Sequence, residues 1–166
     1  MRTILFICTG NTCRSPMAEA IAREILAREG AVAGGERVLV ESAGIAALDG
    51  GAVSDETLEA LSSLGIRHEG RSKRLTADMV RAADVVLAMT PSHADAARRL
   101  VSGEQEHESK VMPVDPRAAM EDPIGMGQDA YDRLARVLRE LLPLRLRDVL
   151  AQRRAKVDHC DQGASA

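Results

Sequence analysis

Residues 1–30 are arranged as a strand, a short polar turn and a helix, and this order constrains the fold more than any other feature. Residues 3–8 (TILFIC) form a β-rich apolar run. Ser15-Pro16 then supplies a helix N-cap and a proline at the first helical position. Apolar residues recur at helical spacing until the helix ends near Gly30. A strand followed at once by a helix is typical of β-α-β units, in which the strands are parallel.

The rest of the chain repeats this alternation. Three more strands are expected at residues 37–43, 84–89 and 110–114, the last of them weak. Helices are expected at residues 54–64, 75–83 and 92–100, and from 128 until Pro143 kinks or ends the last helix. That helix carries an apolar stripe, which is expected to face the core and consists of Tyr131, Leu134, Val137, Leu138, Leu141 and Leu142. The pattern predicts an α/β fold: a single-domain three-layer sandwich with a four-stranded parallel sheet.

Length and composition narrow the class of protein. We expect residues 1–150 to form one domain with its own core and the polar residues 151–166 to form a loose tail. A net charge of −3, with 22 basic residues among 25 acids, argues against a nucleic-acid partner. The N-terminal apolar run is too short for a signal peptide or a membrane span. The odd number of cysteines, three, argues against a secreted protein held together by disulfides. We therefore expect a cytoplasmic protein, without membrane contact, and a monomer rather than an oligomer.

The turn after the first strand holds the residues that can do chemistry. Cys8 and Arg14 are six positions apart, so one tight loop can direct both side chains at one anion. In open parallel sheets ligands bind at the carboxyl ends of the strands, where this loop falls. Its successive backbone N–H groups and the start of the following helix favour both a bound phosphate and the thiolate form of Cys8. This predicts a nucleophilic cysteine and an arginine that holds phosphate oxygens.

A bare Cys-x5-Arg spacing also occurs in structural loops whose cysteine is buried and inert. The position between a strand and a capped helix, with Gly, Asn and Ser interleaved, favours the phosphate-binding interpretation. The histidines and cysteines show no metal-ligand spacing, and chemistry of this kind requires no metal or other cofactor.

Cys8 to Pro16 match the pattern Cys-x-x-Asn-x-Cys-Arg-Ser-Pro, and in this the chain resembles the low-molecular-weight protein phosphatase family. Ser42-Ala43-Gly44 and residues 87–90 (LAMT) extend the resemblance, which spans residues 2–145. It implies a cysteinyl-phosphate intermediate on Cys8, with Arg14 as the phosphate clamp. Asn11 would hold the loop in shape and Ser15 would hydrogen-bond the thiolate. The remaining phosphate contacts would come from the loop residues Thr9, Gly10, Thr12 and Cys13.

The resemblance also implies a general acid from an Asp-Pro pair in a late loop. The chain has two such pairs, which begin at Asp115 and Asp122. The family places its acid nine residues before a tyrosine on the last helix, and Asp122 stands nine residues before Tyr131. Asp122 is therefore the expected acid, and Asp115 is expected to make only a turn.

The loop is similar to that of bacterial protein arginine phosphatases, in which a threonine at the position of Thr12 favours the guanidinium group of phosphoarginine. Members that act on phosphotyrosine tend to carry an aliphatic residue there and aromatic residues beside the acid. Phosphoarginine in proteins is thus the expected substrate, and phosphotyrosine is the alternative. Ile124 departs from the phenylalanine usual in arginine phosphatases. Gly70 stands where the family often has a histidine that supports Asn11, and His68 is expected at the surface.

Two further hypotheses concern the cysteines, and a third concerns the site as a whole. The resemblance implies that oxidised Cys8 can be held as a Cys8–Cys13 disulfide, with simple packing of Cys13 as the alternative. Arsenate reductases share this fold and a similar loop, but they need two further cysteines in the middle of the chain, and none lies between Cys13 and Cys160. A catalytically inactive phosphate-binding module would be expected to lack Cys8, Arg14 or Asp122, and all three are present.

Overall fold

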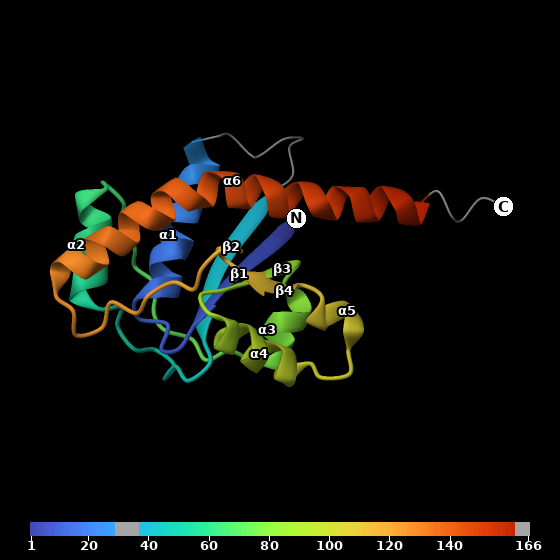
Figure 1. The fold of residues 1–166 in the computed structure, drawn as a ribbon, viewed down its shortest axis with the longest axis horizontal. Coiled ribbons are helices and arrows are strands. Elements are labelled where there is room, and N and C mark those ends of the chain that lie inside the picture. The colour runs from blue at the N-terminus through green and yellow to red at the C-terminus, as the bar shows by residue number, and fades with distance from the viewer. Residues whose placement is uncertain (29–36, 162–166) are drawn as a thin grey trace.

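One parallel sheet organises the molecule (Figure 1). The protein is described from a computed structural model, which covers residues 1–28 and 37–161, with side chains as far as Ala151. The strands stand in the order β2-β1-β3-β4 and comprise β1 (Arg2–Cys8), β2 (Val38–Gly44), β3 (Val85–Ala88) and β4 (Val111–Pro113). The central strand β1 pairs in parallel with β2 from Arg2↔Val38 to Cys8↔Gly44, and with β3 from Ile4↔Val85 to Ile7↔Ala88. The predicted sheet is confirmed, and Cys8 is the last residue of its central strand.

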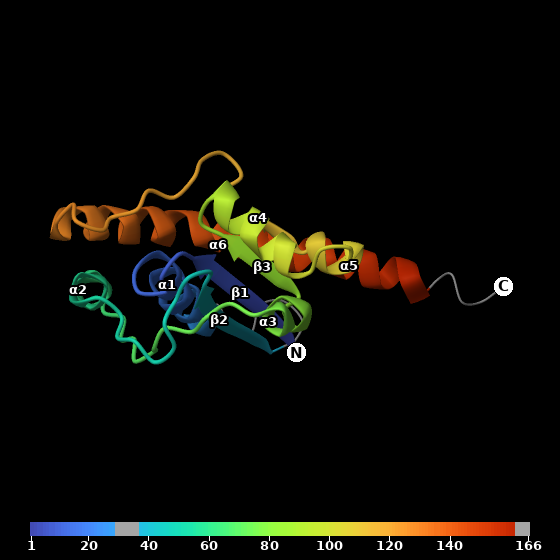
Figure 2. The same cartoon turned by 90° about the horizontal axis from the view of Figure 1, so that it is seen from below.

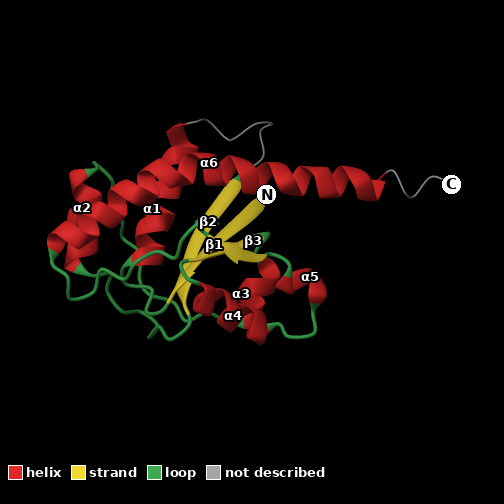
Figure 3. Ribbon diagram, viewed as in Figure 1, coloured by secondary structure: helices red, strands yellow, loops and turns green. Residues whose placement is uncertain are grey.

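Helices cover both faces of the sheet, as the two perpendicular views show (Figures 1 and 2). On one face lie α1 (Arg14–Arg28) and α6 (Gln128–Asp161), which pack against each other and against α2 (Asp55–Ser63). On the other face lie α3 (Ala77–Ala82) and α4 (Pro91–Leu100), beside the short α5 (Gln105–Glu108). Figure 3 shows the strands enclosed between these helices. The three-layer α/β sandwich is therefore confirmed, while α5 was not predicted.

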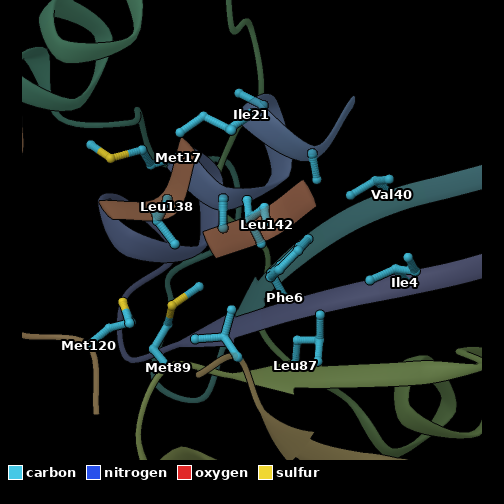
Figure 4. Packing of buried hydrophobic residues seen from close by; sticks show 14 of the residues in the cluster. Ile4, Phe6, Met17, Ile21, Val40, Leu87, Met89, Met120, Leu138 and Leu142 are labelled. Atoms are coloured by element: carbon cyan, nitrogen blue, oxygen red, sulfur yellow. The ribbon is translucent and has the colours of Figure 1, made fainter. Parts of the chain in front are cut away.

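Successive side chains of a strand point to opposite faces of the sheet, so the core is divided into two clusters, one on each face. Ile4, Phe6 and Cys8 of β1 point to the side of α1 and α6, whereas Leu5 and Ile7 point to the side of α3 and α4. Figure 4 shows Ile4 and Phe6 near the side chains that the two covering helices supply, among them Met17, Ile21, Leu138 and Leu142. Cys8 thus emerges at the end of β1 on the same side as α1.

Three helices begin at a residue whose side chain caps the helix N-terminus. The hydroxyl oxygens of Ser54, Thr76 and Thr90 accept hydrogen bonds from the N–H groups of Thr57, Met79 and His93. Each cap satisfies one of the N–H groups that a helix start leaves without an intrahelical partner.

The last helix differs from its prediction in three ways. It does not end at Pro143, and residues 151–161, which were expected to belong to a loose tail, extend it to Asp161. Proline removes one backbone hydrogen bond, but the buried residues Leu142, Leu146 and Val149 on either side keep the helix packed on the core. Val137, expected in the core stripe, is 46% exposed.

Some sequence predictions lie outside the described residues. These are the end of the first helix near Gly30 and residues 162–166 of the expected tail; the described helix α1 ends at Arg28. The division of the chain at residue 150 into a domain and a tail stays a prediction.

Candidate active site

The loop of residues 9–13 turns through Asn11, whose φ of 55° lies in the left-handed region. The Asn11 side chain is buried and donates from Nδ2 to Ser15 Oγ at 2.9 Å and to Ser42 Oγ at 2.8 Å. Its Oδ1 accepts from the N–H of Lys73 at 2.8 Å. The Ser42 hydroxyl in turn donates to the buried carboxylate of Glu19. The loop is thereby tied to β2, to α1 and to the segment before α3.

His68 occupies the space beside Gly70. A Cβ atom placed on Gly70 would lie 2.4 Å from His68 Nε2, so the imidazole fills the volume that a side chain at position 70 would take. His68 is half-buried, between the exposed residues Arg67 and Glu69. Burial lowers the pKa of His68, while the charge of nearby Glu19 acts in the opposite direction. Asn11 is held by Ser42, Ser15 and Lys73 without a histidine at position 70.

The Cys8 thiol is buried and faces polar donors. Its Sγ is hydrogen-bonded to Ser15 Oγ at 2.9 Å and accepts from the Asn11 N–H at 3.3 Å. Ser15 Oγ accepts from Asn11, and its one proton lies within reach of two acceptors, Cys8 Sγ and the carbonyl of Ala43 at 3.4 Å. Among the described residues, the backbone N–H groups of Gly10, Thr12 and Cys13 have no backbone acceptor. These groups, with the first N–H groups of α1, can donate to an anion bound in the loop.

Arg14 and Asp122 meet beside this loop. Arg14 Nη2 donates to Asp122 Oδ2 at 2.5 Å, and Arg14 Nη1 donates to the carbonyl of Met120 at 3.3 Å. The side chain of Arg14 is 6% exposed and that of Asp122 is 41% exposed. Asp122 Oδ1 also accepts from the N–H of Ile124 at 3.2 Å. The tertiary fold thus brings the predicted arginine and the predicted acid together.

Asp115 is placed differently. Its Oδ1 accepts from the N–H of Arg117 at 2.8 Å, as in a turn. This backbone hydrogen bond is the main reason why the pKa of Asp115 is lowered. Of the two Asp-Pro aspartates, Asp122 is the one that contacts Arg14.

His93 is a site residue that sequence reasoning missed. Its Nε2 lies 2.9 Å from Thr9 Oγ1 and its Nδ1 lies 2.9 Å from Thr90 Oγ1, and the residue is 3% exposed. Burial is the main cause that lowers the pKa of His93 to about 4; the charge of Arg14 acts in the same direction and that of Asp122 opposes it. His93 is therefore neutral near pH 7. In the sequence, the position of His93 in the first turn of the helix after β3 could have indicated a site residue, because that turn and Thr9 lie at the same edge of the sheet.

Thr12 and Cys13 connect the loop to α2 and α6. The Thr12 carbonyl accepts from the Ser54 N–H at 3.0 Å and from Thr57 Oγ1 at 3.3 Å. Cys13 Sγ lies 3.5 Å from the hydroxyl of Tyr131, which is 3% exposed, so the predicted core position of Tyr131 is confirmed. Burial and then the Cys13 contact raise the pKa of Tyr131 to about 12. Cys8 and Cys13 are free thiols, and a disulfide between them stays a prediction.

Fold and loop together define a class of protein. The cysteine at the end of the central strand, the arginine at the start of the next helix and the carboxylate opposite them define a cysteine-based phosphatase. Residues 3–156 match the model of the family described as "Low molecular weight phosphotyrosine protein phosphatase", and the chain belongs to that family. Its substrates are phosphorylated proteins.

Three similar proteins show the range of names within the family. The chain is 36% identical over 145 residues to a protein-arginine-phosphatase of Bacillus subtilis (84% of this chain, 91% of the relative). It is 30% identical over 130 residues to the low molecular weight protein-tyrosine-phosphatase PtpB of Staphylococcus epidermidis (78% of this chain, 86% of the relative). A solved structure of the YwlE arginine phosphatase, a mutant with a phosphorylated active-site serine, is 34% identical, with a TM-score of 0.75 over 93% of this chain and 96% of its own.

Neither a membrane span nor a metal cluster is found in the described ranges. No helix there combines the length and the apolar character needed to cross a membrane. Likewise, no group of three or more His, Cys, Asp or Glu side chains that could hold a metal ion occurs among them.

Proposed function

We propose that the protein hydrolyses phosphoarginine in other proteins through a cysteinyl-phosphate intermediate. The observation that carries this proposal is the lack of an exposed aromatic side chain. Phe6 and Tyr131 are the only aromatic residues of the whole chain, and they are 0% and 3% exposed. The phenyl ring of a phosphotyrosine would find no ring to stack on. Ile124 and Met126 beside the acid are 62% and 58% exposed and suit the methylene stem of an arginine instead.

Polar groups of the site also suit a guanidinium. The Thr12 side chain is half-buried on the phosphate loop, and a hydroxyl oxygen can accept from a guanidinium N–H. The half-exposed Asp122 carboxylate can pair with the same planar group. The similarity to a protein that is named a protein-arginine-phosphatase, over most of both chains, supports this choice.

The geometry supports a two-step reaction. Cys8 Sγ attacks phosphorus as the bond from phosphorus to the guanidinium nitrogen breaks, while Arg14 and the loop N–H groups stabilise the charge on the phosphate oxygens. Asp122 gives its proton to the leaving nitrogen. Water then attacks phosphorus, Asp122 accepts a water proton, and the bond from phosphorus to sulfur breaks to return the Cys8 thiolate. The phosphorylated serine of the related YwlE mutant supports a covalent intermediate at this position.

Single-site kinetics of Thr12 variants test the substrate. Wild type is expected to prefer an arginine-phosphorylated protein over a phosphotyrosine peptide under reducing conditions. Thr12→Ile should shift that preference toward phosphotyrosine by at least about tenfold in kcat/KM. The matched control, Thr12→Ser, keeps the hydroxyl and should keep the preference. A wild type that prefers phosphotyrosine would refute the proposal.

Phosphotyrosine is the second candidate. It is favoured by the family description and by the similarity to a protein that is named a protein-tyrosine-phosphatase. In that case the substrate ring would rest on the aliphatic side chains beside Asp122, and Thr12→Ile would change the ratio of the two activities by less than twofold.

We also propose that the protein acts as a cytoplasmic monomer. Two buried free thiols and an odd number of cysteines suit a reducing compartment. Light scattering during size-exclusion chromatography should give one chain per particle, and cell fractionation should place the protein with cytoplasmic markers.

A further inference from the structure

A cavity of about 360 Å³ lies between α6 and the loop that carries Asp122. Its lining includes the loop residues Met120, Asp122, Pro123 and Met126 and, on α6, Ala130, Leu134 and Val137. The charged residues Asp115, Glu121 and Arg133 also line it. A second cavity of about 370 Å³ shares Asp115 and Val137 with the first and continues along α6 past Leu144. Its apolar residues alternate with the charged residues Arg117, Glu140, Arg145 and Asp148. We call the two cavities together the α6 groove.

Exposed apolar side chains lie in this groove and on the loop beside it: Met126, Val137 and Leu144 line the cavities, and Ile124 lies on the loop that carries Asp122. Nine large hydrophobic side chains are exposed among the described residues, and four of them lie on the Asp122 loop or on α6: Ile124, Met126, Val137 and Leu144. Val137 belongs to the apolar stripe of α6 by its spacing, yet it is 46% exposed and lines both cavities. Apolar side chains that are grouped in this way on a protein surface mark a place where another molecule binds.

The groove is continuous with the candidate active site. Met120 and Asp122 line the groove, and both accept hydrogen bonds from Arg14, Met120 through its carbonyl and Asp122 through its carboxylate. A phosphorylated residue that is held by Arg14 therefore has its neighbours in the substrate chain at the mouth of the groove. Since the substrates of this family are phosphorylated proteins, polypeptide extends on both sides of the phosphorylated residue.

We propose that the α6 groove receives an apolar side chain of the substrate protein, from a residue close in sequence to the phosphorylated one. This inference rests on the proposed active site at Cys8, but it does not depend on which phosphorylated residue is cleaved. The contact lies outside the reacting atoms. It favours one class of protein substrate and contributes nothing to small phosphorylated compounds.

Phosphorylated peptides of equal length, which carry leucine or serine at each flanking position in turn, test the proposal. Wild type should prefer leucine at one flanking position by about tenfold in kcat/KM, the size of effect that a buried aliphatic group gives in a specificity pocket. Val137→Glu should remove this preference while the hydrolysis of p-nitrophenyl phosphate stays within about twofold of wild type. Leu100→Glu replaces an apolar residue of similar exposure (42%) at the end of α4 and should keep the preference.

A wild type without any positional preference would overturn the proposal, as would an equal loss of both activities in a folded Val137→Glu variant. Leu144→Glu, at a site that is 67% exposed, repeats the test if Val137→Glu does not fold. The peptides are made once with phosphoarginine and once with phosphotyrosine, and the leucine preference is measured within each series. Failure of the arginine assignment and failure of the groove are thus distinguishable.

Discussion

Arg14 and Asp122 form an ion pair, with 2.5 Å between Nη2 and Oδ2, although they are 108 positions apart in the chain. Arg14 is almost wholly buried, whereas the side chain of Asp122 is 41% exposed, so Asp122 is the partner with room to move. A phosphate that enters the loop brings its own negative charge to the same guanidinium nitrogens. We therefore expect phosphate and Asp122 to compete for Arg14, and we expect phosphate binding to release the carboxyl group for the proposed proton transfer.

Asp122→Asn tests this competition. We expect kcat to fall by about two to three orders of magnitude, as for the loss of a general acid. Inorganic phosphate should inhibit the variant more strongly than wild type, because the amide no longer competes with it as an anion. Steady-state kinetics with p-nitrophenyl phosphate gives both quantities. Asp115→Asn, in the other Asp-Pro pair, is the control and should change neither; an unchanged inhibition constant in Asp122→Asn would contradict the competition.

Substitution of Asn11 separates backbone conformation from hydrogen bonding. Asn11→Ala loses three side-chain hydrogen bonds and keeps a φ of 55° that alanine adopts poorly, so we expect a loss of about 2–4 kcal/mol in the free energy of unfolding. Asn11→Gly loses the same hydrogen bonds without the conformational cost and should be more stable than Asn11→Ala by about 1 kcal/mol. Urea unfolding measures both, and equal stabilities would argue against a left-handed Asn11 in solution.

Gly44→Ala should disturb the phosphate-binding loop, because Gly44 lies directly against the backbone of that loop. A Cβ atom at position 44 would lie 2.6 Å from the Thr9 carbonyl oxygen and 2.8 Å from the Asn11 nitrogen, and backbone at such distances has to shift. We expect kcat/KM to fall by at least about tenfold, because loop donors displaced by a fraction of an ångström stabilise the phosphate less well. Gly70→Ala is the matched control, since its Cβ meets only the His68 ring, which can rotate away. Similar losses in both variants would show a general effect on stability.

His93 predicts how stability depends on pH. Its pKa is lowered from 6.5 to about 4 in the folded protein, so between these values the unfolded chain binds a proton that the folded chain does not. Stability should therefore fall as the pH drops from 6.5 toward 4, with a contribution from this group of at most about 1.4 kcal/mol per pH unit. His93→Gln should flatten the curve in urea titrations over this range. The slope that remains comes from the other groups whose pKa is lowered, among them His68, Glu104 and Asp115, and a slope identical to wild type would contradict the role of His93.

Local patterns predict the part of this structure that depends on neighbours in sequence. The strand, the turn and the helix around Cys8 lie within one short stretch, and their hydrophobic period predicts them. The predicted N-cap is wrong: α1 begins at Arg14, and Ser15 lies in its first turn, where its hydroxyl is hydrogen-bonded to Cys8. The match of Asp122 to Arg14 could be expected only through a resemblance, because no local rule brings together residues so far apart.

Other contacts depend on three-dimensional placement that one sequence does not reveal. The bond between His93 and Thr9 requires knowledge of how α4 sits beside the loop. The position of His68 depends on the space left open at Gly70. The exposure of Val137 could not be predicted for a related reason: periodicity identifies an apolar stripe, but it does not tell how much of that stripe neighbouring elements cover. The continuation of α6 through Pro143 likewise depends on how the helix packs on the core.

The pairing of β1 on both sides has a consequence for how this chain can change in evolution. Ile4, Phe6 and Cys8 share one face of the sheet, and the register with β2 and β3 fixes that assignment from two directions. An insertion or deletion of one residue between Arg2 and Cys8 would turn the sulfur to the opposite face, away from Ser15 and Asn11. Exchanges among aliphatic residues in β1 change the packing, but they leave the sulfur where it is. A change in the number of residues in this strand is therefore expected to cost more activity than an exchange of one aliphatic residue for another.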